Sequence, residues 1–124
     1  MKVIDSNGWL EAFTEGKNAS IFKSILLEGD LVVPAITIYE VVKRLLVLGF
    51  PDEAVRAEHH MRRFPVVELT AARASKAAHL AVQYKLPLAD GIIFAAALEF
   101  KATLWTQDED FANIAEVKYV PYGD

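Results

Sequence analysis

Four acidic residues, far apart in the 124-residue chain, each stand where an apolar stretch meets a helical pattern: Asp5, Glu40, Asp90 and Asp108. Asp90 is the least expected of them, because it lies within the mostly apolar stretch LPLADGIIFAAALEF, residues 86–100. A carboxylate in such surroundings becomes neutral, finds a partner or coordinates a metal ion. Carboxylate oxygens are the ligands that Mg²⁺ and Mn²⁺ prefer in proteins. The four acids therefore suggest a divalent cation site.

Each acid also has a purely structural interpretation. Asp5 follows a short apolar run and is a possible N-cap of a short helix. Thr37 and Glu40 have the spacing of a capping box, in which the two side chains bond to backbone amides at the start of a helix. Glu40 also precedes Arg44 by four residues, which is the spacing of an ion pair on a helix surface. None of these roles requires a cation.

The two later acids have similar alternatives. A carboxylate at the start of the apolar helix that contains Asp90 is favoured by the helix dipole, although this helix is expected to begin before Asp90 itself. Thr106 and Glu109 form a second possible capping box, and Asp108 or Asp110 is a possible N-cap. However, three acids within three residues repel one another, whereas capping needs only one of them.

Short β-branched runs alternate with longer helical patterns along the chain. Strands are predicted at residues 2–5, 30–34, 66–69, 103–106 and 117–120. Helices are predicted within residues 37–49, 51–63, 71–84 and 88–100. Alternating strands and helices are typical of right-handed βαβ units and a parallel sheet covered on both faces. The predicted class is α/β, a three-layer α/β/α sandwich with a central, mainly parallel sheet, in a single domain over residues 1–124.

The predicted strand order along the chain places all four acids at the same end of their βα units. In a parallel sheet these ends meet at one edge, where ligands collect. Carboxylates a few ångströms apart repel strongly unless protons or cations lie between them. The shared position therefore favours a metal site over four unrelated structural roles.

Composition restricts the class of protein further. Hydrophobic residues make up 53% of the chain, cysteine is absent and the net charge is −4. Disorder, a disulfide framework and a thiolate metal site are therefore excluded, and a dedicated basic nucleic-acid binder is disfavoured. No apolar run approaches the roughly 20 residues of a membrane helix, and the N-terminus lacks a signal-peptide pattern. We expect a soluble cytoplasmic protein without a membrane partner.

Charge is unevenly distributed along the chain. Residues 43–76 contain seven Lys or Arg and four acidic residues, whereas the rest contains six basic and thirteen acidic residues. This asymmetry fits an enzyme that holds cations in one place and a polyanion in another, and it equally fits ordinary surface variation.

Four sequence blocks occur in a specific order: VIDSN, TIYEVVKR, LADGIIFAAAL and LWTQDEDF. Their order and spacing resemble those of a PIN-domain ribonuclease, and most closely the toxin subunit of VapBC toxin–antitoxin pairs. The resemblance extends from Asp5 to the last predicted strand. One departure is Gly91, directly after the third acid, where a larger residue is more usual.

The resemblance implies a role for each matching residue. Asp5, Glu40, Asp90 and Asp108 match an acidic quartet that holds one or two Mg²⁺ or Mn²⁺ ions. Three further positions match an accessory acid and two hydroxyls beside the quartet: Asp110, Ser6 and Thr106. Lys43 and Arg44, one turn beyond Glu40, are candidates for contact with the RNA backbone, although a solvated helix face is the simpler explanation.

The resulting hypothesis is a toxin with endoribonuclease activity that hydrolyses RNA phosphodiester bonds with metal-activated water. Its implied partners are RNA, a small cognate antitoxin and a second copy in a homodimer. Two alternatives stay open. One is a PIN-like scaffold that binds RNA or protein without cutting it. The other is a Mg²⁺-dependent phosphatase or receiver domain, which is disfavoured because DSNGW lacks the Asp-x-Asp pattern of such a phosphatase.

Overall fold

The computed structural model describes residues 1–122 and has a parallel β-sheet at its centre. The strands are β1 (Lys2–Ile4), β2 (Val33–Pro34), β3 (Val66–Val67), β4 (Thr103–Thr106) and β5 (Val117–Tyr119). β1, β4 and β5 pair in that order, and β2 pairs with β3. A parallel bridge between Lys2 and Leu31 joins the two groups, giving the order β3-β2-β1-β4-β5. The predicted parallel sheet is confirmed.

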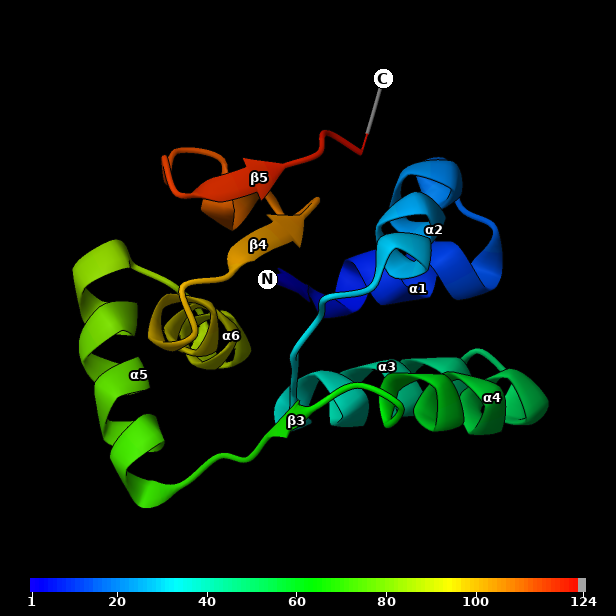
Figure 1. Ribbon diagram of the computed structural model, residues 1–124, viewed down its shortest axis with the longest axis horizontal. Coiled ribbons are helices and arrows are strands. Elements are labelled where there is room, and N and C mark those ends of the chain that lie inside the picture. Colours follow the sequence, from blue (N-terminus) through cyan, green and yellow to red (C-terminus); the bar gives the residue numbers. More distant parts are fainter. Residues whose placement is uncertain (123–124) are drawn as a thin grey trace.

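Helices cover both faces of this sheet (Figure 1). They are α1 (Ser6–Thr14), α2 (Ala19–Glu28), α3 (Ala35–Val47), α4 (Pro51–Met61), α5 (Ala71–Tyr84) and α6 (Leu88–Glu99), followed by the short 3₁₀ helix η1 (Glu109–Phe111). One core contains apolar residues of α6, including Ile93 and Phe94, together with Val3 of β1. A second core contains residues of α1 to α4 together with Ile4. The predicted three-layer α/β/α sandwich is therefore confirmed.

Neighbouring residues of β1 point into opposite cores, as the alternation of side chains along a strand requires. Val3 and Ile4 are both almost completely buried, although they belong to different core clusters. Burying such a side chain stabilises the fold by about 1.5–3 kcal/mol. This two-sided burial fixes the register of β1, and with it the position of Asp5 just beyond the strand.

Near the N-terminus, the sequence pattern predicted less helix than the structure contains. Only a possible short helix after Asp5 was expected in the first thirty residues, whereas α1 and α2 both form there. In α1 the pattern is interrupted by Gly8, which lies so close to Phe22 that a Cβ atom would be 2.5 Å from its ring. Close packing against α2 therefore explains a glycine inside α1. The predicted strand 66–69 is shorter than expected, since only Val66–Val67 pair with β2.

Gly91 allows α6 to approach α5 closely. A Cβ atom at Gly91 would lie 2.9 Å from the Cβ of Ala81 and 3.2 Å from the backbone oxygen of Ala77. The unusual glycine after Asp90 thus has a packing role and need not loosen the first turn of the helix, which retains the backbone hydrogen bond from Gly91 to Pro87.

We expect Gly91→Val to destabilise the fold, because overpacking of a tight contact costs about 1–3 kcal/mol. Thermal unfolding monitored by circular dichroism should show a midpoint several degrees below that of the wild type. Ala78→Val, at an exposed position of α5, controls for the lower helix propensity of valine. Equal midpoints for Gly91→Val and the wild type would contradict the close-packing explanation.

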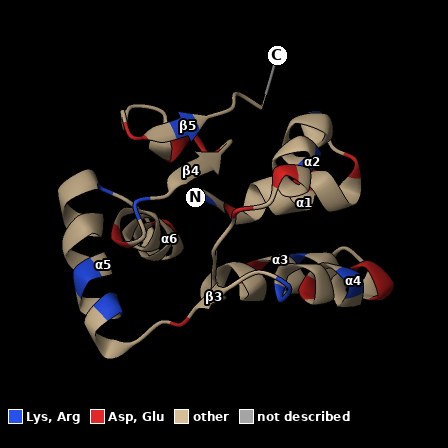
Figure 2. Ribbon diagram, viewed as in Figure 1, with Lys and Arg blue, Asp and Glu red and all other residues tan. Residues whose placement is uncertain are grey.

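The basic residues of segment 43–76 do not form one surface. They divide between α5 and the α3–α4 region, which lie at opposite sides of the view in Figure 2. Within residues 1–122, no helix alone is long and apolar enough to cross a membrane. α5 and α6 meet that test only as a pair, and they are bent by 108° relative to each other.

Candidate metal centre

Three of the four predicted acids come together at one edge of the sheet. Asp5, Asp90 and Asp108 each offer a carboxylate oxygen, and these oxygens lie within 4.8 Å of one another. Asp5 and Asp108 meet because β1 and β4 are adjacent parallel strands, with Ile4 opposite Trp105. Asp90 comes from the first turn of α6, which packs against both strands. Residues far apart in the sequence thus form a single acidic cluster.

Asp5 is held by three hydrogen bonds. It is the N-cap of α1, as one interpretation of the sequence predicted, and its Oδ1 accepts from the Ser6 backbone amide at 2.7 Å. Its Oδ2 accepts from the Thr106 hydroxyl at 2.7 Å and from the Asn7 side-chain amide at 3.4 Å. A carboxylate has about four acceptor positions. The three bonds fix its orientation and leave about one position for a cation.

The carboxylates of the cluster repel one another in the metal-free protein. Burial, supplemented by the charges of Glu40 and Asp108, raises the pKa of Asp5 to about 6 against the hydrogen bonds from Thr106 and Ser6. Burial and the charges of Asp5 and Asp108 raise the pKa of Asp90 to about 8. Groups whose pKa values rise in this way favour either protons or a cation between them. The donor set contains only oxygen, which suits a hard divalent cation.

Glu40 lies on α3 at the margin of the cluster rather than inside it. Its pKa is raised by burial and by the charge of Asp108, while the neighbouring Ser6 hydroxyl opposes this shift. Its Oε1 atom is buried and accepts no hydrogen bond from the residues that the structure describes. Glu40 is therefore within electrostatic range of the cluster and has a buried oxygen without a hydrogen-bond partner among the described residues.

The predicted capping box of Thr37 and Glu40 is wrong. α3 begins at Ala35, so Thr37 is already inside the helix, where its side chain is completely buried. The predicted ion pair between Glu40 and Arg44 is also absent from residues 1–122, in which every detected ion pair lies elsewhere. Neither structural role accounts for Glu40.

Asp108 has a structural role as well as its place in the cluster. It is the N-cap of η1, and its Oδ1 accepts from the Asp110 backbone amide at 2.9 Å. The predicted capping box of Thr106 and Glu109 is wrong, because Thr106 belongs to β4 and its hydroxyl bonds to Asp5. Asp110 is exposed, yet its charge contributes to the raised pKa of Asp90.

The candidate RNA-contact residues lie beside Glu40. Lys43 and Arg44 are exposed on α3 and line a shallow hollow together with Glu40. The Nζ atom of Lys43 lies 5.6 Å from the ring centre of Tyr39, which also lines the hollow. Positive charge is thus available about one helical turn from the margin of the acidic cluster.

Sequence reasoning missed two polar residues at this edge, Asn7 and Gln107. The side chain of Asn7 contacts both Asp5 and Thr106, and its Oδ1 accepts from the Gln107 backbone amide at 3.3 Å. Both residues follow closely on predicted strands, at the position where the four acids were sought. That shared position was the available signal.

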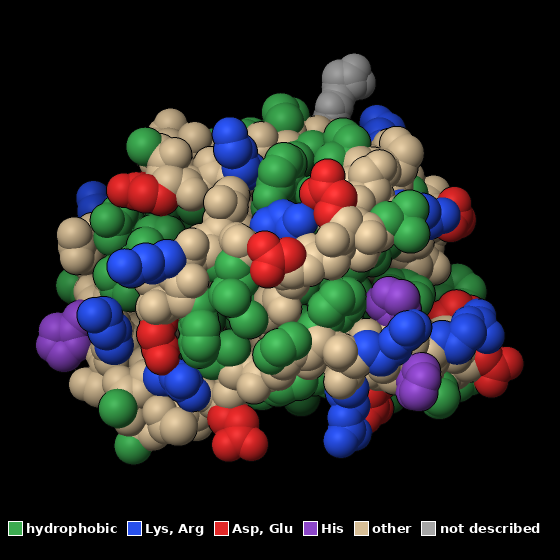
Figure 3. All heavy atoms as spheres, viewed as in Figure 1, with side chains coloured by type: hydrophobic (Ala, Val, Ile, Leu, Met, Phe, Trp, Pro, Cys, Tyr) green, Lys and Arg blue, Asp and Glu red, His purple; other side chains and the backbone are tan. Residues whose placement is uncertain are grey.

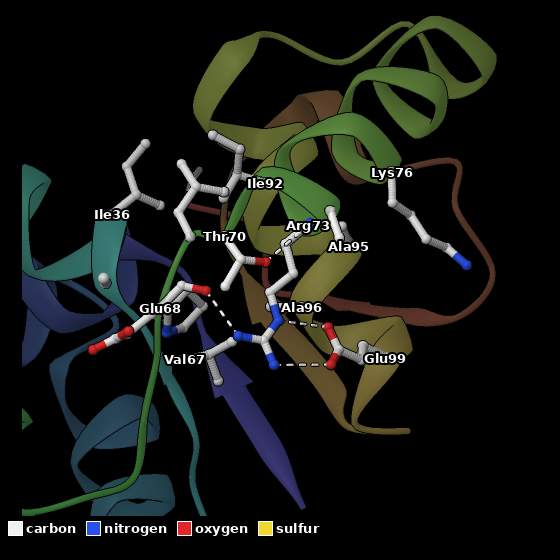
Figure 4. A pocket seen from close by; sticks show the side chains of 14 residues that line it. Ile36, Val67, Glu68, Thr70, Arg73, Lys76, Ile92, Ala95, Ala96 and Glu99 are labelled. Carbon is white, nitrogen blue, oxygen red and sulfur yellow. Dashed lines mark hydrogen bonds and ion pairs between the residues drawn. The ribbon is translucent and has the colours of Figure 1, made fainter.

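A separate apolar cavity of about 430 Å³ lies among α3, α5, α6 and the segment after β3 (Figure 4). Ile36, Val67 and Ile92 are among its apolar residues, and none of the four acids lines it. At its rim, Arg73 donates two hydrogen bonds to Glu99, at 2.9 and 3.0 Å. Exposed hydrophobic side chains also gather between charged ones on the face seen in Figure 3. The cavity is distinct from the acidic cluster, because no residue of the cluster lines it.

Residues 2–117 match the family model described as "PIN domain". Among solved structures, a toxin–antitoxin complex from Klebsiella pneumoniae is similar at 25% sequence identity and a TM-score of 0.80, with both chains fully covered. The Sarcin-Ricin loop cleaving toxin VapC20 from Mycobacterium tuberculosis is similar at 16% identity and a TM-score of 0.82, covering 98% of this chain and 100% of the other. VapBC2 from Rickettsia felis, bound to a promoter DNA fragment, has 12% identity and a TM-score of 0.71, with 96% of each chain covered. The search of curated proteins gave no match.

Proposed function

Because the chain belongs to the PIN domain family, we propose that it is a Mg²⁺- or Mn²⁺-dependent endoribonuclease and the toxin of a type II toxin–antitoxin pair. The convergence of Asp5, Asp90 and Asp108 to within 4.8 Å carries this proposal. The repulsion within this cluster destabilises the fold. Carboxylates with raised pKa values, such as Asp5 and Asp90, are found preferentially at functional sites, which supports a functional role for the cluster. We further propose that residues 1–124 form one domain and that this domain acts in the cytoplasm.

The proposed roles follow from position. Asp5, Asp90 and Asp108 hold one or two cations, which when bound acidify a water molecule and neutralise charge on the scissile phosphate. Glu40 orients water through its buried Oε1 atom, which has no other partner among the described residues. Thr106 holds Asp5 through its hydroxyl, and Ser6 does so through its backbone amide. Asp110 adds negative charge at the rim.

Lys43 and Arg44 are proposed to bind the RNA backbone, because both are exposed beside Glu40. Replacing both with alanine should weaken RNA affinity about equally for all sequences and reduce the salt slope of binding by about 1–2. Fluorescence anisotropy with labelled single-stranded RNA in EDTA, over a series of salt concentrations, measures both quantities. Arg56→Ala on α4 serves as the control, and an unchanged slope in the double variant would assign these side chains to a solvated face.

The proposed partners are a small antitoxin and a second copy of the chain. The solved structures from Klebsiella pneumoniae and Rickettsia felis contain toxin–antitoxin pairs, which supports an antitoxin here. Both kinds of partner need apolar surface, and the cavity beside Arg73 and the exposed hydrophobic side chains offer it. Analytical ultracentrifugation of the purified chain tests the proposed homodimer.

The function is tested by incubating purified protein with total RNA and mapping the cleavage ends. We expect discrete new ends with Mg²⁺ or Mn²⁺ and none with excess EDTA. Isothermal titration with Mn²⁺ in the absence of RNA provides an independent readout. Absence of both cleavage and cation binding would overturn the nuclease proposal and leave a non-catalytic scaffold.

A further inference from the structure

Asn7 connects the two strand ends that carry Asp5 and Asp108. Its Nδ2 atom lies 3.4 Å from both Asp5 Oδ2 and Thr106 Oγ1, and its Oδ1 atom accepts from the Gln107 amide at 3.3 Å. The side chain thus contacts its own turn, the end of β4 and the backbone just before Asp108. No other side chain among residues 1–122 has hydrogen bonds to all three.

The Thr106 hydroxyl completes this connection. It donates to Asp5 Oδ2 at 2.7 Å and accepts from the Asp108 amide at 3.0 Å, besides its contact with Asn7. A hydroxyl has one donor and two acceptor positions, so the three contacts use its whole capacity. The orientation of this hydroxyl, and with it the position of the Asp108 backbone, is therefore defined from both sides.

The segment between β4 and η1 has a second attachment, through Asn18 at the start of α2. Asn18 donates from its side chain to Gln107 Oε1 at 2.8 Å and to the Pro121 backbone oxygen at 3.2 Å. Its own backbone amide donates to the buried Glu11 carboxylate at 2.8 Å. Gln107 is thus bound through its backbone by Asn7 and through its side chain by Asn18, so the segment between β4 and η1 is attached to α1 and to the start of α2.

We infer that Asn7 is a positioning residue that holds Asp5 and Asp108 at cation-binding distance before a cation arrives. This inference rests on the proposed function. Carboxylate oxygens that lie within 4.8 Å of one another repel, so the metal-free cluster tends to spread apart. Asn7 opposes that tendency because it bonds both to Asp5 and to the backbone amide of Gln107, the residue directly before Asp108. Prearranged ligands bind a cation more tightly because less ordering remains to be done on binding.

The test compares Asn7→Ala with the wild type by isothermal titration with Mn²⁺ in the absence of RNA. We expect the affinity for Mn²⁺ to fall by about 10–100-fold, the usual effect of losing a residue that orients metal ligands. Asn113→Ala is the matched control, because Asn113 is exposed, follows η1 and has no side-chain hydrogen bond within the described part of the chain. Its affinity should equal that of the wild type.

Amide hydrogen exchange, followed by NMR on the metal-free protein, gives a readout that does not depend on binding. The Asp108 amide should exchange faster in Asn7→Ala, because its acceptor Thr106 is no longer held by Asn7. Amides of α5, whose residues have no hydrogen bond to Asn7, should be unaffected and report an intact fold. If Asn7→Ala does not fold, Asn7→Ser, which keeps a small polar group in the first turn of α1, is measured in the same way.

The outcomes separate this inference from the proposed function. Wild-type Mn²⁺ affinity together with unchanged Asp108 exchange in the Asn7 variants would overturn the positioning role and leave the nuclease proposal intact. Failure of the wild type itself to bind Mn²⁺ would overturn both. Weaker binding with faster Asp108 exchange supports both.

Discussion

Asp90→Asn is expected to abolish RNA cleavage while making the metal-free protein more stable. The substitution removes a carboxylate, proposed to bind the cation, from a cluster whose oxygens lie within 4.8 Å. Loss of a direct ligand should exceed the 10–100-fold effect typical of a residue that only orients ligands, so we expect cleavage to fall by more than roughly 100-fold. Stability should rise because the asparagine amide is neutral, whereas burial and neighbouring charges raise the pKa of the Asp90 carboxylate to about 8.

Two measurements on the same preparation test this prediction. The cleavage rate is measured with Mg²⁺, and the midpoint of thermal unfolding is measured in EDTA at pH 8. The midpoint should rise by about 4 °C or more, corresponding to about 1 kcal/mol. Asp52→Asn, an exposed acid in the first turn of α4, is the matched control and should leave cleavage unchanged. Wild-type cleavage by Asp90→Asn would refute the metal-site assignment, and a lowered midpoint would refute the electrostatic explanation.

The metal-free protein is expected to become less stable as the pH rises from about 6.5 to about 8. In the folded state the pKa of Asp90 is about 8, compared with an ordinary value of 3.8. Between these values the folded state binds more protons than the unfolded state, so the free energy of unfolding falls as the pH rises. Asp5 acts in the same direction up to its folded pKa of about 6. A saturating divalent cation should remove much of this fall, because it replaces the protons.

Above pH 6.5, the pH dependence of stability reports on Asp90 without the opposing contribution of His60. Burial, with a smaller effect of the charge of Arg63, lowers the pKa of His60 below 6.5, so its contribution to stability increases with pH up to that value. Unfolding midpoints in EDTA at pH 6.5, 7, 7.5 and 8 therefore report mainly on Asp90. Asp90→Asn should give a nearly flat profile over this range. A wild-type midpoint that rises with pH in this window would contradict the prediction.

The sequence predicted the arrangement of the acids because strand positions were clear. β1 and β4 are short β-branched runs with an acid just after each, and parallel pairing brings such ends together. The same reasoning could not predict whether Glu40 lies inside the cluster or beside it. Glu40 lies on α3 and reaches only the margin of the cluster. The end of a strand defines the place of the next residue to within about one position. Successive residues of a helix point in directions that differ by 100°, so the direction of Glu40 depends on where the helix begins.

The errors in capping arose from helix boundaries. Sequence patterns identified α3 but placed its start at Thr37, whereas Pro34 precedes the helix and Ala35 begins it. A shift of two residues removes a capping box completely, because the box requires the first residue to lie outside the helix.

The hydrogen bonds of Asn7 were also unpredictable, since Asn7 and Gln107 are a hundred residues apart and meet only through the pairing of β1 with β4.

The strand order also determines when the acidic cluster can exist during synthesis. Asp5 and Thr106 are separated by 101 positions, and β1 lies between β2 and β4 in the sheet. A ribosome that adds about 5–20 residues per second incorporates Asp108 about 5–20 s after Asp5. A nascent chain therefore lacks the complete cluster until the segment after β4 has been made and β4 has paired with β1.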